Sequence, residues 1–184
     1  NGVNLIPQYA VSDSTPFNSP VEMVLNLAAG QAVEFPAVSG QVVVAGVNGP
    51  EGNTNYESGT VGRSGLSSVY GPPGALVGVF LGSGPPDGTA PPNLGFGCGA
   101  RDLPVVSPML QQVFYIGNGF TPAGQLKKFV IPPGASRLFL GVLDDGGNNY
   151  DNCGSFSVSA VVSGPPPPPV PGQATVYAVF DIAL

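Results

Sequence analysis

The chain has little of what most enzymes use for chemistry. It contains no histidine and no tryptophan, and only 9% of its 184 residues are charged. Without histidine, the commonest general acid–base group and the usual partner of a nucleophile are missing. We therefore expect no enzymatic activity. The remaining enzymatic alternative is a glycosidase pair drawn from carboxylates that lie in separate loops: Glu51, Glu57, Asp87 and Asp102.

Basic residues and long apolar runs are also scarce. The chain has five Lys and Arg residues and a net charge of −6, and so few cations cannot neutralise a track of phosphates. We expect no nucleic-acid partner. The longest apolar stretches, such as ALVGVFL at 75–81, have the length of a strand. The chain contains no run of about eighteen apolar residues, so we expect no transmembrane helix.

Only two cysteines are present, and both lie in Gly-rich segments. Cys98 lies in GFGCGA and Cys153 in DNCGSF, and we expect a disulfide between these two loops, the alternative being two unpaired thiols. The chain begins at Asn1 rather than Met, as a mature chain does after removal of a signal peptide, and as a trimmed chain also does. Together with few Lys and abundant Gly and Pro, these features favour a secreted protein, extracellular or at the cell surface.

Strand patterns dominate the chain, whereas no window shows a clear helical period. Alternating or apolar segments are separated by turn sequences such as PPG, NGP and DGG. The pattern predicts an all-β, antiparallel β-sandwich, jelly-roll-like and with about eight strands, over residues 20–162. Segments 48–73 and 82–108 are expected to be long loops. The predicted strands are 21–27, 32–38, 41–47, 75–81, 111–117, 126–131, 136–143 and 154–162.

Three further segments flank the predicted sandwich. We expect residues 1–19 to be an extended N-terminal segment and residues 163–172, SGPPPPPVPG, to be a polyproline linker that would span roughly 30 Å. Residues 173–184 predict a strand that we expect to be donated to the sheet of a neighbouring subunit. The alternative is that this strand folds back onto its own domain. Its apolar residues alternate: Val176, Ala178, Phe180, Ile182 and Leu184.

One acidic loop stands out in this weakly charged chain. The sequence DDGGNNYDN at 144–152 supplies three Asp carboxylates and three Asn amides around two glycines. Calcium prefers six to eight such oxygen ligands and tolerates irregular geometry. The loop therefore suggests a calcium site, the alternative being an Asx-rich hairpin turn without metal.

The motif around this loop resembles the calcium loop of the bacterial galactophilic lectins of PA-IL type. It reads RLFLGVLDDGGNNYDNCGSFSV here, and three weaker motifs precede it in the same order: AAGQAVEF at 28–35, GPEGN at 49–53 and GPPGALVGVFLG at 71–82. The resemblance implies a small jelly-roll sandwich that binds one Ca²⁺. The implied side-chain ligands are one of Asp144 and Asp145, since two alignments of the loop remain open, together with Asp151 and Asn152. The implied backbone ligands are the carbonyl of Asn148 and one from Val43 or Val44.

The sugar contacts of that family carry over less completely. The family binds galactose through the same ion and through a His and a Gln, yet this chain has no His, and residues 53–70 contain no Gln. Another glycan could still stack on a tyrosine, and the loop candidates are Tyr56, Tyr70 and Tyr150. We favour a structural subunit of an extracellular assembly of identical copies, such as a filament, sheath or surface layer. The alternative is a calcium-dependent carbohydrate-binding lectin.

Overall fold

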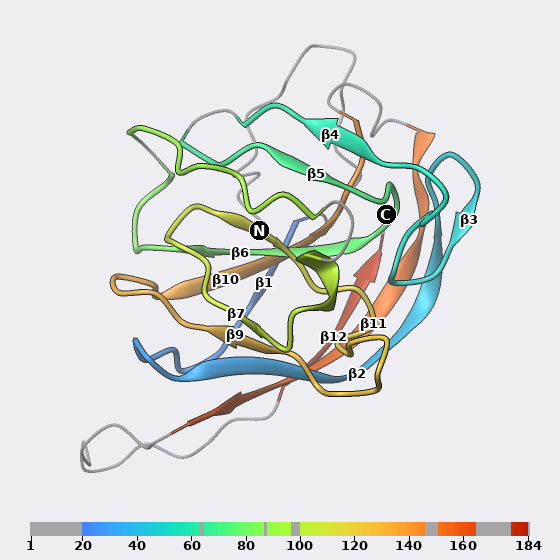
Figure 1. The fold of residues 1–184 in the computed structure, drawn as a ribbon. Helices are drawn as coiled ribbons and strands as arrows, with labels where there is room; N and C mark the ends of the chain where they lie inside the picture. Colours follow the sequence, from blue (N-terminus) through green and yellow to red (C-terminus); the bar gives the residue numbers. More distant parts are fainter. Residues whose placement is uncertain are drawn as a thin grey trace.

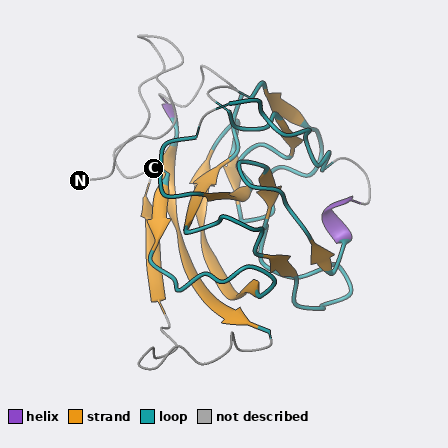
Figure 2. Cartoon of the chain, turned by 90° about the vertical axis from the view of Figure 1, so that its left-hand side faces the viewer, coloured by secondary structure: helices purple, strands orange, loops and turns teal. Residues whose placement is uncertain are grey.

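The chain folds into two main sheets that pack around one core, and buried and exposed side chains alternate along parts of their strands. The computed structural model describes residues 20–62, 65–86, 88–96, 100–145, 151–164 and 178–183. The regular elements of this part are strands together with the 3₁₀ turn η1 (Ala100–Asp102) and a 3₁₀ residue at Asp151. The prediction of an all-β sandwich is therefore confirmed. The long strands gather on one side of the molecule in Figure 2, and loops and short strands lie on the other.

The smaller layer is a four-stranded antiparallel sheet. Its spatial order is β1-β10-β6-β8, so strands distant in the sequence lie side by side (Figure 1). Leu138 and Leu140 of β10 are fully buried, as is Phe80 of β6. The bounds of its strands are β1 (Val21–Met23), β10 (Arg137–Val142), β6 (Leu76–Leu81) and β8 (Val113–Tyr115).

The larger layer has the order β12-β11-β2-β9-β7, with the short β3 added to one end of β2. The pair β7–β9 is parallel, and the other pairs described in this sheet are antiparallel. A separate two-stranded antiparallel hairpin joins β4 (Ser58–Thr60) to β5 (Val69–Gly71). The strands of the larger sheet are β12 (Ala178–Ala183), β11 (Cys153–Ser163), β2 (Ala32–Val43), β9 (Lys128–Val130), β7 (Val105–Val106) and β3 (Val47–Asn48).

A chain of four phenylalanine rings crosses the core between the two sheets. Phe114 of β8 stacks on Phe129 of β9, with ring centroids 4.9 Å apart. On one side Phe80 packs against Phe114, and on the other Phe35 meets Phe129 edge-on. All four side chains are fully buried. Because aromatic pairs add to the area that they bury, this chain of rings holds the two layers together.

The prediction of two separate strands in the region of β2 is wrong. Segments 32–38 and 41–47 were expected to be separate strands, but β2 runs without a break from Ala32 to Val43. Gly40 has a φ of 106°, and a Cβ there would lie 2.3 Å from the carbonyl oxygen of Ser155 in β11. Only glycine fits this contact, so the residue that suggested a turn instead lets β2 pass close to its neighbour.

Short strands inside the long connections were not predicted. Strands β4 and β5 lie within 48–73 and β7 lies within 82–108, two segments that were expected to be loops. Each has only two or three residues, so none shows a period of its own. The predicted C-terminal strand, 173–184, is represented by β12, which pairs with β11 of the same chain; Val176 and Leu184 lie outside the described residues.

Candidate functional site

The acidic loop begins where β10 ends and is held there by a buried leucine. Leu143 is 3% exposed. Its N–H donates to the carbonyl of Ala75 at 2.9 Å, and its own carbonyl accepts from the N–H of Gly74 at 2.7 Å. Asp144 and Asp145 follow directly, and the chain returns at residue 151 to enter β11. Residues 146–150 lie outside the described part of the chain, so the predicted ligand Asn148 cannot be placed.

Asp144 lies at the centre of the described part of the loop. Its Oδ1 accepts a hydrogen bond from the N–H of Asp145 at 2.7 Å, and its Oδ2 accepts one from Nδ2 of Asn152 at 2.9 Å. Burial raises the pKa of the Asp144 carboxyl, and the nearby charges of Asp145 and Asp151 raise it further, whereas the two hydrogen bonds lower it. The structure thus brings together four of the predicted ligands: Asp144, Asp145, Asp151 and Asn152.

The chemistry of these donors fits calcium. Three carboxylates and an amide supply hard oxygens, and a bound cation would offset the repulsion between charges that burial already disfavours. Among the residues that the structure describes, however, no three His, Cys, Asp or Glu side chains are arranged as a ready metal site. The calcium site therefore stays a prediction, with these residues as the ones that would hold the ion.

Asp145 ties this loop to the β4–β5 hairpin. Its Oδ1 accepts a hydrogen bond from the N–H of Gly59 at 3.2 Å, across 86 positions of sequence. On the partner strand Tyr70 lies opposite Gly59, and a Cβ on this glycine would be only 2.7 Å from Cδ2 of the tyrosine. The ring thus covers the glycine, yet Tyr70 remains 49% exposed. A partly exposed aromatic ring lies beside the acidic loop.

The end of β2 also reaches this site. Val43 pairs with Cys153, the residue that follows Asn152, so the predicted backbone ligands are near the loop. The carbonyl of Val44 already accepts a hydrogen bond from Nδ2 of the buried Asn48 at 2.6 Å. A metal at the Val44 oxygen would have to share it, and Val43 is itself paired on both sides, with Cys153 and with Val47.

The predicted disulfide cannot be followed in the structure. Cys153 is exposed at the start of β11, and Cys98 lies outside the described residues. The pairing stays a prediction. An exposed thiol at the first residue of a strand is accessible to a partner from a neighbouring loop.

A second polar cluster, which the sequence reasoning missed, lies around Lys127. This side chain is only 2% exposed. Its Nζ donates to the carbonyl of Ile116 at 3.2 Å and lies 4.6 Å from the centre of the Tyr115 ring. Burial lowers the pKa of Lys127 to about 8, an effect that Asp102 and Glu51 oppose and Arg101 reinforces. The segment LKKFVI did contain a signal for the burial of Lys127. Side chains at alternate positions share one face of a strand, and Phe129 and Ile131, on the face of Lys127, are core residues.

Of the carboxylates considered for a glycosidase pair, Glu51 and Asp102 both lie within electrostatic reach of Tyr115 and Lys127. Glu51 lies next to the core through an isolated bridge to Ala75, and its carbonyl accepts from the Tyr115 hydroxyl at 3.2 Å. Asp102 is exposed in η1, and Asp87 lies outside the described residues. The absence of enzymatic activity stays an expectation from the sequence.

Comparison with known proteins adds no assignment. No protein-family model, no curated protein and no solved structure matches this chain. The similarity to PA-IL-type lectins therefore depends on the motifs alone. In the described part of the chain, no helix has the length and apolar character needed to cross a membrane.

Proposed function

We propose that this chain is a secreted, calcium-binding β-sandwich that serves as a structural subunit of an extracellular assembly. In this proposal neighbouring copies are joined when each donates its C-terminal strand to the next. A heterologous contact of this kind need not close, and it builds a filament, sheath or surface layer. The copies themselves are the partners, and calcium bound at the acidic loop stabilises each subunit.

The observation that carries this proposal is the connection between β11 and β12. These strands are neighbours in the sheet and antiparallel, and such pairs are usually joined by loops of two to five residues. Here the connection runs from 164 to 177, and it contains the proline run 165–169. A spacer of this length and stiffness is more than a hairpin needs, whereas it suits a strand that reaches a second sheet.

Light scattering on the full chain and on a chain that ends at Ser163 tests the proposal. We expect the full chain to form large particles and the truncated chain to be a monomer. The truncated chain must show a cooperative melting transition, so that a change in mass is not the result of unfolding. Equal masses for the two chains would contradict the proposal.

A second candidate function, calcium-dependent glycan binding, is favoured by the position of Tyr70. A sugar ring can stack on an exposed aromatic face while its hydroxyls bind a neighbouring ion. Tyr70 is exposed over Gly59, and the N–H of Gly59 donates to Asp145 in the acidic loop. This arrangement brings a stacking surface next to the predicted calcium ligands.

A glycan array probed with and without EDTA tests this second function. We expect calcium-dependent binding that Tyr70→Ala abolishes and Tyr70→Phe retains, because phenylalanine keeps the stacking face. No binding to any glycan in calcium would exclude the lectin function and would leave the assembly proposal unaffected.

A further inference from the structure

The register between β11 and β12 matches the burial pattern of β11. The buried positions Phe156, Val158 and Ala160 lie opposite Ile182, Phe180 and Ala178 respectively. The alternate positions of β11, which are serines, lie opposite the remaining residues of β12. A strand shifted by one residue would place its apolar set on the other face. This edge of β11 therefore specifies both the presence of a strand and its register.

The edge requires a strand but not a strand from the same chain. Without β12, β11 would be the edge of the larger sheet, with unpaired backbone groups beside core residues that are 0–1% exposed, and such an edge readily pairs with another chain. The β12 of a second copy has the same sequence and would make the same contacts. Whether β11 pairs with its own β12 or with the β12 of a second copy therefore depends on the connection between the strands and on the protein concentration.

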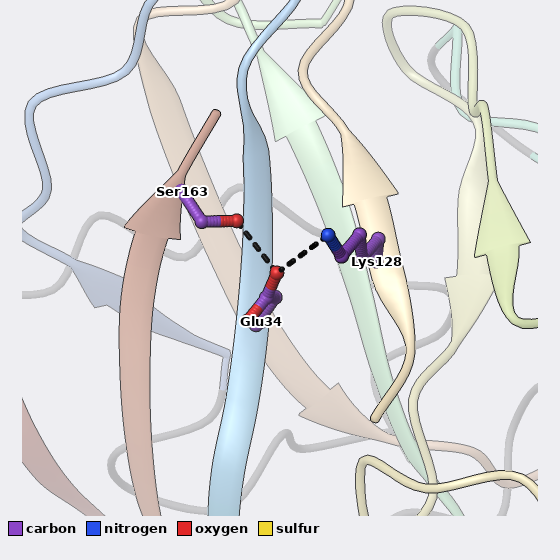
Figure 3. A network of polar contacts seen from close by, with 3 residues as sticks. All are labelled: Glu34, Lys128 and Ser163. Atoms are coloured by element: carbon purple, nitrogen blue, oxygen red, sulfur yellow. Dashed lines mark hydrogen bonds and ion pairs between the residues drawn. The ribbon is translucent and has the colours of Figure 1, made fainter. Parts of the chain in front are cut away.

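The connection starts from a fixed point. Ser163, the last residue of β11, donates through its hydroxyl to Oε1 of Glu34 at 2.6 Å, and Nζ of Lys128 lies 3.6 Å from the same oxygen (Figure 3). Glu34 is 9% exposed, so this network fixes the end of β11 against β2 and β9. Gly164, with a φ of 123°, follows directly and lies against Gln31.

In this structure β12 returns to its own sheet, but the proline run makes this return less favourable than a flexible connection would. Five prolines in the polyproline II conformation extend for about 15 Å, whereas adjacent strands are only about 5 Å apart. Eight residues, 170–177, follow the proline run before β12 begins at Ala178. With a flexible connection of equal length, the effective concentration of β12 at its own β11 would be millimolar. A stiff connection lowers this effective concentration.

We infer that the acceptor for the donated strand is the β11 edge of a second copy of this chain, occupied in the register that β12 has here. This inference rests on the proposed function and specifies its partner and its docking surface. Each sandwich then keeps a complete six-residue β11–β12 pairing, with β12 supplied by another subunit.

Cross-linking between two chains, each with one added cysteine, tests the inference. One chain carries Ser157→Cys and the other Asp181→Cys, because these two positions lie directly opposite each other at a separation that a disulfide can bridge. Cys98 and Cys153 are retained, and the linked peptides are identified by mass. The two chains are unfolded, mixed at high concentration, refolded and oxidised. A chain that carries both substitutions serves as the control for the register.

We expect the peptides containing positions 157 and 181 to be linked between different chains. A mismatched pair, Ser157→Cys with Val179→Cys, should link several-fold less. Replacing 165–169 by a Gly/Ser sequence of equal length should lower the yield between chains several-fold, because a flexible connection returns to its own sheet more readily.

The outcomes separate the inference from the proposed function. If the control chain links internally, the mixed chains do not link and the full chain still forms large particles, the inference is wrong and another edge accepts the strand. If the mixed chains do not link and the full chain is monomeric, both the inference and the assembly proposal fail. If the control chain itself does not link, the register is wrong and the inference fails with it.

Discussion

Nδ2 of Asn152 donates a hydrogen bond to Oδ2 of Asp144 at 2.9 Å, and so joins the two ends of the acidic loop. This contact brings the carboxylate at the end of β10 to the amide that precedes β11. It also places Asp144 within electrostatic reach of Asp145 and Asp151. This polar contact thus joins the loop at the point where its negative charge is concentrated.

Removing the charge of Asp144 should have opposite effects with and without calcium. In EDTA, Asp144→Asn relieves a half-buried charge that two neighbouring carboxylates disfavour, so the melting temperature should rise. In calcium the same change removes a predicted ligand and the melting temperature should fall. Binding at a hundredfold excess over the dissociation constant contributes about 2.7 kcal/mol to the unfolding free energy.

Asp151→Ala should also abolish the stabilisation by calcium, and Asp102→Ala, in the exposed turn η1, should preserve it. Calorimetry or fluorescence melting measures these effects. If EDTA does not change the melting temperature of the unmodified protein, the assignment of the calcium loop is refuted.

The buried Lys127 should make the protein more stable at mildly alkaline pH. Burial lowers the pKa of Lys127 from 10.5 to about 8 in the folded state. Between these two values the unfolded chain binds more protons than the folded chain, so the free energy of unfolding rises with pH. Burial raises the pKa of Tyr115, so above about pH 10 the unfolded chain loses this proton first and stability falls.

We therefore expect a stability maximum between about pH 9 and 10, with a gain on the order of 1–2 kcal/mol over pH 7.5. Urea unfolding at a series of pH values measures this curve. Lys127→Met removes the titrating group and should flatten the rise. Stability that declines steadily from pH 8 to 9.5 would contradict the placement of this amine in the core.

Gly40 should not tolerate a side chain. A Cβ there would overlap the Ser155 carbonyl oxygen at 2.3 Å, and the φ of 106° disfavours other residues. Gly40→Ala should cost about 2–4 kcal/mol of unfolding free energy. Gly84→Ala, at a position with open space around it, should change stability by less than about 0.5 kcal/mol. Equal effects of the two changes in chemical denaturation would contradict the close approach of β2 and β11.

The stack of rings between the sheets should be the most costly part of the core to disrupt. Phe114 contacts Phe80 on one side and Phe129 on the other, so Phe114→Ala leaves a cavity between the layers and should cost about 3–5 kcal/mol. Phe114→Leu keeps more of the volume and should cost clearly less. A loss under 1 kcal/mol for the alanine variant, measured by denaturant unfolding, would show that the layers do not depend on this contact.

The sequence predicted best three strands that each contribute several buried side chains to the core. Strands β6, β10 and β11 were predicted within one residue at each end, because their apolar residues recur with the period of a strand. Strands β4 and β5 were missed because each has three residues and pairs only with the other. The acidic loop was recognisable because its charges are close together in an otherwise weakly charged chain.

By itself the sequence determined the all-β class, the faces of the long strands and the position of the acidic loop, since each depends on residues near one another in the chain. Only the tertiary structure decided that Asp145 meets Gly59 below Tyr70, that Lys127 is buried beside Tyr115, and that Glu34 holds Ser163. These contacts join residues on different strands. Which strands become neighbours is set by the packing of the two sheets around their common core, and no local pattern specifies it.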